Sequence, residues 1–172
     1  MKNIEIERKF LVRKKDINFD YKKYKHDEMI QGFIFLSPAI RVRKSGKKYY
    51  LTLKTKPPKS LNAKNDIART EYEVEISKKA FTGLIKMCKG RIIYKTRYYI
   101  PYIYNKKNYI IELDVFKKSL KGLFYAEIEF DSLKSAYKIE LPDWFYKDVT
   151  GIKKYKNTEL SICKNIKNLL KY

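Results

Sequence analysis

The sequence predicts an α+β fold, mainly β, in which an eight-stranded antiparallel β-barrel forms a tunnel with flanking helices and a C-terminal helix. Eight segments alternate polar and apolar residues, or are rich in β-branched and aromatic residues, as strands are. A chain of 172 residues, 44% of them hydrophobic, is long enough to bury a core. Closing the eight strands into a barrel removes exposed strand edges.

The strands are expected at residues 3–12, 29–36, 39–45, 48–55, 67–76, 92–100, 108–116 and 123–131. Apolar residues fall on one face of a predicted helix over 78–89, which Ser77 can cap and Gly90 can end. Ser132 is expected to cap a short helix that runs through Tyr137.

Three further segments complete the expected organisation. Residues 13–28 predict a loop with a short helix, and residues 56–66, with two adjacent prolines, predict an exposed loop. Residues 158–171 carry an apolar stripe at helical spacing, which predicts a helix that packs across the barrel or closes one tunnel mouth. We expect residues 1–172 to form a single domain.

Composition narrows the function classes. The net charge of +21 suggests attraction to polyanions, but 33 of the 40 basic residues are lysines scattered along the chain, and no block of five like charges occurs. We therefore expect no specific nucleic-acid partner. No run of about 18 apolar residues occurs, so no membrane span is expected. The first residues enter a strand pattern at once, and two lone cysteines suggest reduced thiols, so a cytoplasmic location is expected.

Charged residues recur on one face of the predicted strands. In the first strand Glu5, Glu7 and Lys9 point to the same side, because side chains alternate along a strand. One such triplet is also what a solvated strand face shows, but its recurrence favours a site. The basic members are Lys9, Arg41, Arg43, Lys54, Arg69, Lys95 and Arg97. The acidic members are Glu5, Glu7, Glu71, Glu73, Glu75, Glu112, Asp114, Glu127 and Glu129.

The choice of arginine on these faces indicates phosphate binding. Four of the chain's seven arginines lie there, although lysine is otherwise used far more often. The planar guanidinium binds phosphate oxygens through two parallel hydrogen bonds, which an ammonium cannot do. So many inward charges would be prohibitive in a dry barrel. A wet tunnel that holds a polyanion and hard divalent cations resolves that conflict.

These residues resemble the CYTH superfamily, the triphosphate tunnel metalloenzymes. The resemblance starts at Glu5-x-Glu7-x-Lys9 and continues in family order along nearly the whole chain. The further matching segments are Gln31-Gly32-Phe33-Ile34, Arg41-Val42-Arg43, Tyr50 to Lys54, Arg69 to Glu73, Lys95-Thr96-Arg97, Glu112 to Phe116, Ala126 to Glu129, Pro142 with Trp144, Asp148-Val149-Thr150 and Tyr155-Lys156-Asn157. The resemblance implies an eight-stranded tunnel that binds a linear triphosphate.

The resemblance also implies roles for the charged residues. It places one metal among Glu5, Glu7, Glu127 and Glu129. It assigns the substrate's phosphates to Lys9, Arg41, Arg43, Lys54, Arg69, Lys95 and Arg97. Lys9, Glu71, Glu73 and Asp114 are the catalytic candidates, the three acids for a second metal or the attacking water. Mg²⁺ or Mn²⁺, with two divalent ions, is the expected cofactor, and Ca²⁺ is expected to inhibit because its looser coordination positions phosphates less strictly.

Small members of the family with the Gln-Gly-aromatic segment resemble inorganic triphosphatases, which cleave tripolyphosphate to pyrophosphate and phosphate. That is the expected function, in a monomer or a homodimer. A nucleoside or thiamine triphosphatase, or an adenylate cyclase of the fourth class, is an alternative. A non-catalytic module that binds polyphosphate or nucleic acid is another, but such a module gains nothing from nine carboxylates that face its ligand.

Overall fold

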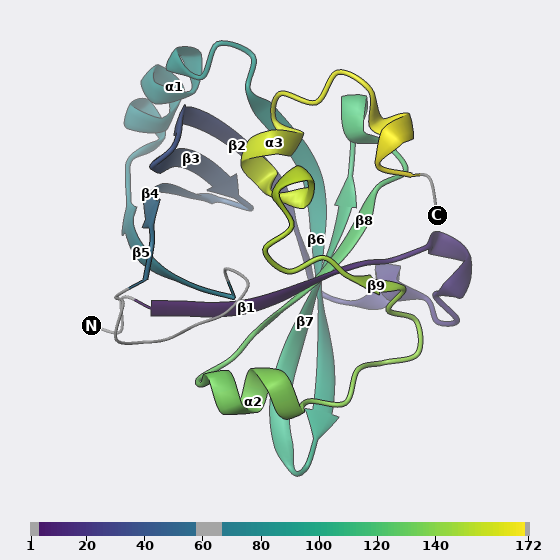
Figure 1. Ribbon diagram of the computed structural model, residues 1–172. Coiled ribbons are helices and arrows are strands. Elements are labelled where there is room, and N and C mark those ends of the chain that lie inside the picture. The colour runs from purple at the N-terminus through teal and green to yellow at the C-terminus, as the bar shows by residue number, and fades with distance from the viewer. Residues whose placement is uncertain (1–3, 58–66, 171–172) are drawn as a thin grey trace.

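Eight strands form a closed antiparallel barrel in a computed structural model, which describes residues 4–57 and 67–170 (Figure 1). The order of the strands is β5-β4-β3-β2-β6-β7-β8-β1, and β1 also pairs with β5, which closes the barrel. The strands are β1 (Ile4–Leu11), β2 (His26–Leu36), β3 (Ala39–Ser45), β4 (Lys48–Thr55), β5 (Ala68–Glu75), β6 (Ile92–Tyr104), β7 (Lys107–Phe116) and β8 (Phe124–Glu129). The expected fold class is confirmed.

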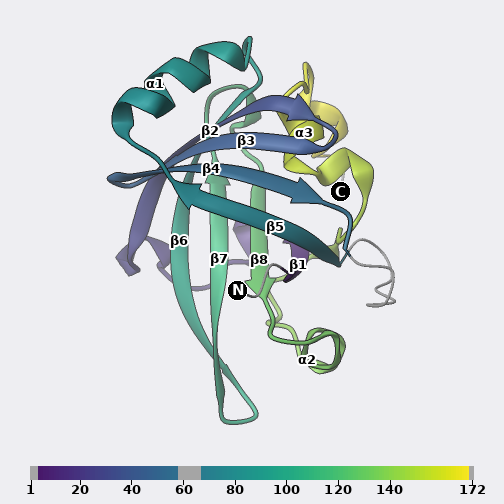
Figure 2. The same ribbon diagram turned by 90° about the vertical axis from the view of Figure 1, so that its left-hand side faces the viewer.

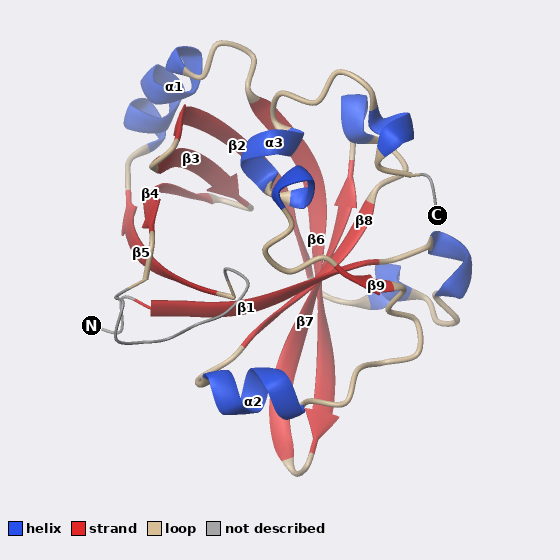
Figure 3. Ribbon diagram, in the orientation of Figure 1, coloured by secondary structure: helices blue, strands red, loops and turns tan. Residues whose placement is uncertain are grey.

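Short helices cover the outside of the barrel (Figure 3). Helix α1 (Lys78–Met87) packs on β2, β3 and β4, and the Ser77 side chain caps it by accepting a hydrogen bond from the Ala80 amide (3.1 Å). Helix α2 (Leu133–Lys138) packs on β1, and Ser132 caps it as expected. The hairpin of β6 and β7 extends beyond the rest of the barrel (Figure 2).

The expected C-terminal helix is wrong in extent. The segment contains only α3 (Asn157–Leu160) and a 3₁₀ turn at Ile166–Asn168, joined by turns and bends. Its apolar side chains pack against one end of the barrel. The segment was expected to pack across the barrel or to close one tunnel mouth, and this position corresponds to the second placement. Spacings of three and four residues satisfy successive tight turns as well as a continuous helix, so periodicity could not separate the two.

Other boundaries also differ from the expectation. β2 begins at His26, inside the region expected to be a loop with a short helix, and two 3₁₀ turns at Lys14–Asp16 and Tyr21–Lys23 precede it. β6 continues to Tyr104, because its outer part pairs with β7 in the extended hairpin. A two-residue strand, β9 (Lys147–Asp148), pairs with β1. Most of the expected loop at 56–66 lies outside the described residues.

The interior of the barrel changes from charged to apolar along its axis. Leu11, Phe33, Ile93, Phe116 and Tyr125 point inward and form one buried cluster, which the C-terminal segment covers with Val149, Tyr155, Leu160 and Leu169. Each of the five lies two residues from an inward polar residue on the same strand, respectively Lys9, Gln31, Lys95, Asp114 and Glu127. One end of the barrel is therefore filled, and the polar interior begins directly beyond that filling.

Gly32 permits the close contact between β2 and α1. Its neighbours Gln31 and Phe33 are buried in the barrel interior, while Gly32 itself faces α1. A Cβ at this position would lie 2.6 Å from both Cys88 Sγ and Ile85 Cδ1. The helix therefore lies so close to the strand that only a hydrogen atom fits between them.

None of the helices in the described residues has the length and apolar character that crossing a membrane requires.

Substituting Gly32 at this contact and Gly83 on the exposed side of α1 should have opposite effects. Gly32→Ala should lower the free energy of unfolding by about 1–3 kcal/mol, because α1 must move away from β2. Gly83→Ala, inside α1 with no atom within 4 Å of the added Cβ, should raise it by about 0.5–1 kcal/mol. Urea denaturation of both variants measures the difference. Equal stability of the two variants would contradict the close packing at Gly32.

Candidate active site

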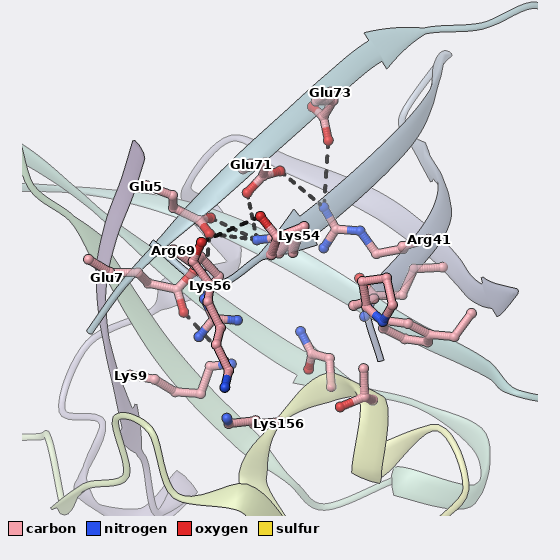
Figure 4. Close-up of a pocket in the computed structure, with 18 of the residues that line it drawn as sticks. Glu5, Glu7, Lys9, Arg41, Lys54, Lys56, Arg69, Glu71, Glu73 and Lys156 are labelled. Carbon is pink, nitrogen blue, oxygen red and sulfur yellow. Dashed lines mark hydrogen bonds and ion pairs between the residues drawn. The ribbon is translucent and has the colours of Figure 1, made fainter. Parts of the chain in front are cut away.

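The barrel encloses a cavity of about 950 Å³ lined by charged side chains (Figure 4). Twelve of the fourteen predicted site residues line it: Glu5, Glu7, Lys9, Arg41, Arg43, Lys54, Arg69, Glu71, Glu73, Arg97, Glu127 and Glu129. The other two, Lys95 and Asp114, are buried and do not line it. The alternation of the strands thus brings the predicted residues together from six strands.

Strand register places opposite charges beside one another at several positions, four of which form ion pairs. The paired Cα partners are Lys9 with Glu127, Arg97 with Asp114, Lys54 with Glu71, and Arg69 with Glu5. Their charged atoms lie 2.9, 2.7, 2.7 and 4.0 Å apart respectively. Directly opposed side chains of opposite charge stabilise a sheet and offset the cost of burying each charge. The register of the barrel therefore accounts for how its interior tolerates so many ions.

One wall of the cavity, from β3 to β5, is a network of these pairs. Lys54 Nζ contacts Glu71 Oε2 and Glu5 Oε2, both at 2.7 Å. Arg41 Nη2 lies 3.6 Å from Glu71 and 3.5 Å from Glu73. Figure 4 shows these contacts converging in the cavity. Burial, and then the neighbouring positive charge of Arg43, lower the pKa of Arg41. Only partly compensated, this guanidinium can accept a further anion.

On the opposite wall of the cavity, buried side chains hold Arg97 in position. Asp114 accepts two hydrogen bonds from Arg97, from Nε and Nη2, each 2.7 Å long. Asp114 also pairs with Lys95, and these two side chains are 0% and 1% exposed. Burial, and then the adjacent charge of Arg97, lower the pKa of Lys95 to about 8. The structure thus places Lys95 and Asp114 one layer behind the cavity, where they orient Arg97. Strand alternation correctly predicted that both side chains point into the barrel, but it could not predict that they lie behind the cavity surface.

Carboxylates oppose one another at the remaining positions. Glu7 and Glu129 are Cα partners on β1 and β8. Glu112 and Glu127 are partners on β7 and β8, where Arg97 pairs with both carboxylates. The Glu129 side chain makes no ion pair or hydrogen bond within the described residues. Crowding by protein atoms, and then the charges of Glu112, Glu5 and Glu7, raise the pKa of Glu129 to about 7. Burial and Glu127 likewise raise the pKa of Glu7. A cation between these strands would remove that electrostatic cost.

The donor set at this place suits a hard divalent cation. As they stand, no three carboxylate, imidazole or thiolate groups of the described residues converge closely enough to hold a metal. Glu5 and Glu127 instead contact the ammonium groups of Lys54 and Lys9. The chemistry nevertheless fits Mg²⁺ or Mn²⁺, because Glu7 and Glu129 are directly opposed residues with oxygen ligands and raised pKa values. Exchange of the lysine partners would free the other two carboxylates.

Three buried donors of the cavity have no hydrogen-bond partner among the described residues. They are Gln31 Nε2 on β2, and Arg41 Nε and Arg43 Nε on β3. Gln31 is 1% exposed and is the Cα partner of Arg43, so these donors belong to adjacent strands. A buried donor without a partner costs free energy, which an anionic ligand would recover. This part of the cavity is therefore suited to bind an oxyanion.

Several polar residues of the cavity wall received no role from the sequence, among them Gln31, Lys56 and Lys156. Gln31 and Lys156 entered only as parts of matching segments, and Lys56 entered only as part of the expected loop. Lys56 follows Lys54 by two residues, a strand signal that could have found it. Lys156 lies in the irregular segment before α3, where no periodicity predicts the direction of a side chain.

Comparisons with known proteins agree with this geometry. The CYTH domain family model matches residues 3–156. The chain belongs to the CYTH family. It is 34% identical over 163 residues to the inorganic triphosphatase of Nitrosomonas europaea, an alignment that covers 92% of this chain and 97% of that protein. It is 32% identical over 160 residues to the inorganic triphosphatase of Acetivibrio thermocellus, covering 91% and 92%.

A solved structure shows the same CYTH architecture. The crystal structure of an inorganic triphosphatase superposes with a TM-score of 0.63 at 32% sequence identity, covering 94% of this chain and 96% of that chain. The family expected from the sequence motifs is thereby confirmed.

The buried ion pair behind the CYTH cavity should matter far more for stability than an exposed pair. Asp114→Asn leaves two buried cations short of a counter-charge and should cost about 3–5 kcal/mol of unfolding free energy. Glu75→Gln removes a surface pair with Lys48, whose atoms lie 3.3 Å apart, and should cost less than about 1 kcal/mol. Denaturant titration compares them. A small loss for Asp114→Asn would show that its partners are stabilised in another way.

Proposed function

We propose that this protein hydrolyses inorganic tripolyphosphate to pyrophosphate and phosphate in the cavity of its barrel. The observation that carries the proposal is one cavity in which a set of arginines and lysines faces a set of opposed carboxylates. A polyanion requires the cations, and a divalent ion accounts for the carboxylates. Two relatives at 34% and 32% identity, each covered over more than nine-tenths of its length, are inorganic triphosphatases.

Substrate binding is assigned to the cations of the cavity wall. Lys9, Arg41, Arg43, Lys54, Arg69 and Arg97 bind the phosphate oxygens. Lys54 and Arg41 now contact carboxylates, so each exchanges an acidic partner for a phosphate when substrate enters. Such exchange leaves the cations buried and paired at every stage, which avoids the cost of an isolated charge. Lys95, predicted as a phosphate ligand, is proposed to act through Arg97 instead.

Glu5, Glu7, Glu127 and Glu129 would hold Mg²⁺ or Mn²⁺, and we expect two divalent ions in all. Bound there, the ions supply charge neutralisation of the phosphate oxygens and orientation of the scissile bond. Glu71 and Glu73 lie on the wall formed by β3 to β5 and are proposed to help orient the attacking water. Asp114, buried behind Arg97 on the other wall, is proposed to act through that arginine. Lys9, paired with Glu127 at 2.9 Å, stabilises charge on the phosphates close to the metal site. Ca²⁺ is expected to inhibit.

Other triphosphates are the competing substrates. A nucleoside or thiamine triphosphatase, or a cyclase, would use the same cavity for its phosphates but needs a pocket for the organic group. Phosphate release from tripolyphosphate, ATP and thiamine triphosphate, with cyclic AMP monitored, separates these activities. Binding that persists in EDTA without turnover would favour a non-catalytic module. We further propose a cytoplasmic enzyme, monomeric or homodimeric, consistent with two free cysteines, Cys88 and Cys163.

Glu129→Gln should abolish turnover and leave the fold intact. The amide keeps the shape of the side chain but removes a charge that neighbouring carboxylates repel more than Lys54 attracts it, so stability should not fall. We expect a loss of at least about 100-fold in kcat with Mg²⁺ or Mn²⁺. Phosphate release from tripolyphosphate with Mg²⁺, Mn²⁺, Ca²⁺ or EDTA is the measurement. Full activity in EDTA, or an unaffected variant, would remove the metal site from the proposal.

Arg41→Ala should weaken turnover of tripolyphosphate by about tenfold or more, because a charge-assisted contact to phosphate is lost. Its guanidinium approaches Glu71 and Glu73 only to 3.6 and 3.5 Å, so unfolding free energy should change little. Steady-state kinetics and thermal unfolding are measured together. Severe unfolding with normal activity in the surviving protein would make Arg41 a structural residue.

A further inference from the structure

Strand β1 changes partner along one edge at the place where it carries Glu7 and Lys9. Residues 4–6 of this edge pair with β5, and residues 10–11 pair with β9. Between these ladders the Glu7 amide donates to the carbonyl of Ile67 (2.9 Å), just before β5 begins. No strand of the described chain lies beside the Lys9 backbone on that edge. The barrel wall thus has a gap behind two residues of the candidate active site.

A tight turn at Asp148–Thr150 closes this gap. The Lys9 amide donates to Thr150 Oγ1 (3.0 Å), and the Val149 amide donates to the Lys9 carbonyl oxygen (2.9 Å). The Thr150 hydroxyl donates in turn to Asp148 Oδ1 (2.6 Å), which also accepts from the Thr150 amide (2.8 Å). Because the hydroxyl hydrogen is directed at Asp148, a lone pair remains for the Lys9 amide. The Thr150 side chain stands where a neighbouring strand would offer a carbonyl.

Arg8 ties this turn to the outer face of the same strand. Its Nη2 and Nε donate to Asp148 Oδ2 at 2.6 and 3.2 Å, and its Nη1 donates to the Ala136 carbonyl of α2 at 3.0 Å. The guanidinium also lies over the Phe10 ring, 4.9 Å from its centre. The planar guanidinium of an arginine on β1 can donate hydrogen bonds to the turn and to the helix at the same time. The single ammonium of a lysine cannot reproduce that geometry.

Packing contributes little on the outer side of the gap. A surface recess of about 580 Å³ lies there, lined by Arg8, Ile67, Asp148 and Thr150 with neighbouring residues. On the inner side, Glu7 faces Glu129, and like charges directly opposite each other push strands apart. On its other edge β1 pairs with β8 over residues 7–11. On the edge with the gap, the position of β1 therefore depends on the hydrogen bonds of the turn and of Arg8.

We infer that Arg8, Asp148 and Thr150 form a clamp that positions Glu7 and Lys9 for the reaction. None of the three lines the cavity, so they are positioning residues that act through β1. The inference rests on the proposed function, in which Lys9 and Glu7 serve phosphate and metal. A displacement of about 1 Å in such groups can cost a hundredfold in rate, so a clamp on their backbone affects catalysis directly.

Thr150→Val tests the clamp, because it keeps the shape of the side chain and removes the hydroxyl. We expect hydrogen exchange at the Lys9 amide to accelerate by about tenfold or more, as loss of one hydrogen bond implies. We expect kcat/KM for tripolyphosphate to fall by about tenfold or more. Thr150→Ser retains the hydroxyl and should restore both values. If Thr150→Val does not fold, Asp148→Asn, which weakens the contact with Arg8, is measured in its place.

Phe81→Leu is the matched control, because it destabilises the α1 core far from β1. It should lower the melting temperature without changing Lys9 exchange or kcat/KM measured well below that temperature. Unchanged Lys9 exchange in Thr150→Val, or faster exchange with kcat/KM equal to that of the control, overturns the inference. If the wild-type protein neither binds nor hydrolyses tripolyphosphate, the proposed function is wrong, whereas the exchange rate still decides whether the turn holds β1.

Discussion

The compensation of buried charge is the constraint on which the rest of this structure depends. An ion inside a barrel loses its hydration, and only a partner of opposite charge at short range offsets that cost. The register supplies such partners directly, as in the pairing of Lys54 with Glu71 and of Arg97 with Asp114. A shift of one residue in either pairing would turn one of the two charges to the outside of the barrel. The polar interior therefore specifies the register as strictly as an apolar core does elsewhere.

The same constraint locates the chemistry. Where opposite charges meet, each buried charge is compensated by another residue of the barrel. Where Glu7 meets Glu129, like charges oppose each other, and the pKa of Glu129 rises to about 7. Functional sites are where a protein retains such uncompensated groups, because a ligand supplies the missing charge. The unpaired Nε2 of Gln31 marks the complementary need for an anion. Cation and polyanion together would satisfy both sides of the cavity.

Much of this could be predicted from the sequence, because a strand alternates faces with a period of two. Alternation identified the barrel strands and placed Glu5, Glu7 and Lys9 on the inner face. Alternation carries no information about depth, so Lys95 was expected on the wall and lies behind it. The helical periodicity of residues 158–171 also fitted a series of turns packed on the barrel end. The direction of the Lys156 side chain could not be predicted, because irregular backbone has no periodicity.

The apolar end of the barrel completes the electrostatic argument. Leu11, Phe33 and Tyr125 each lie two residues from an inward polar residue of the same strand. The C-terminal segment covers these three side chains and keeps solvent away from them. Water is thereby kept from one side of Lys9 and Glu127, which are joined at 2.9 Å. Electrostatic interactions strengthen as the surroundings become less polar. The irregular C-terminal segment, which forms little regular structure of its own, thus strengthens the contact between Lys9 and Glu127. The apolar packing of this segment and the charged residues of the cavity thus both determine the electrostatics of the candidate active site.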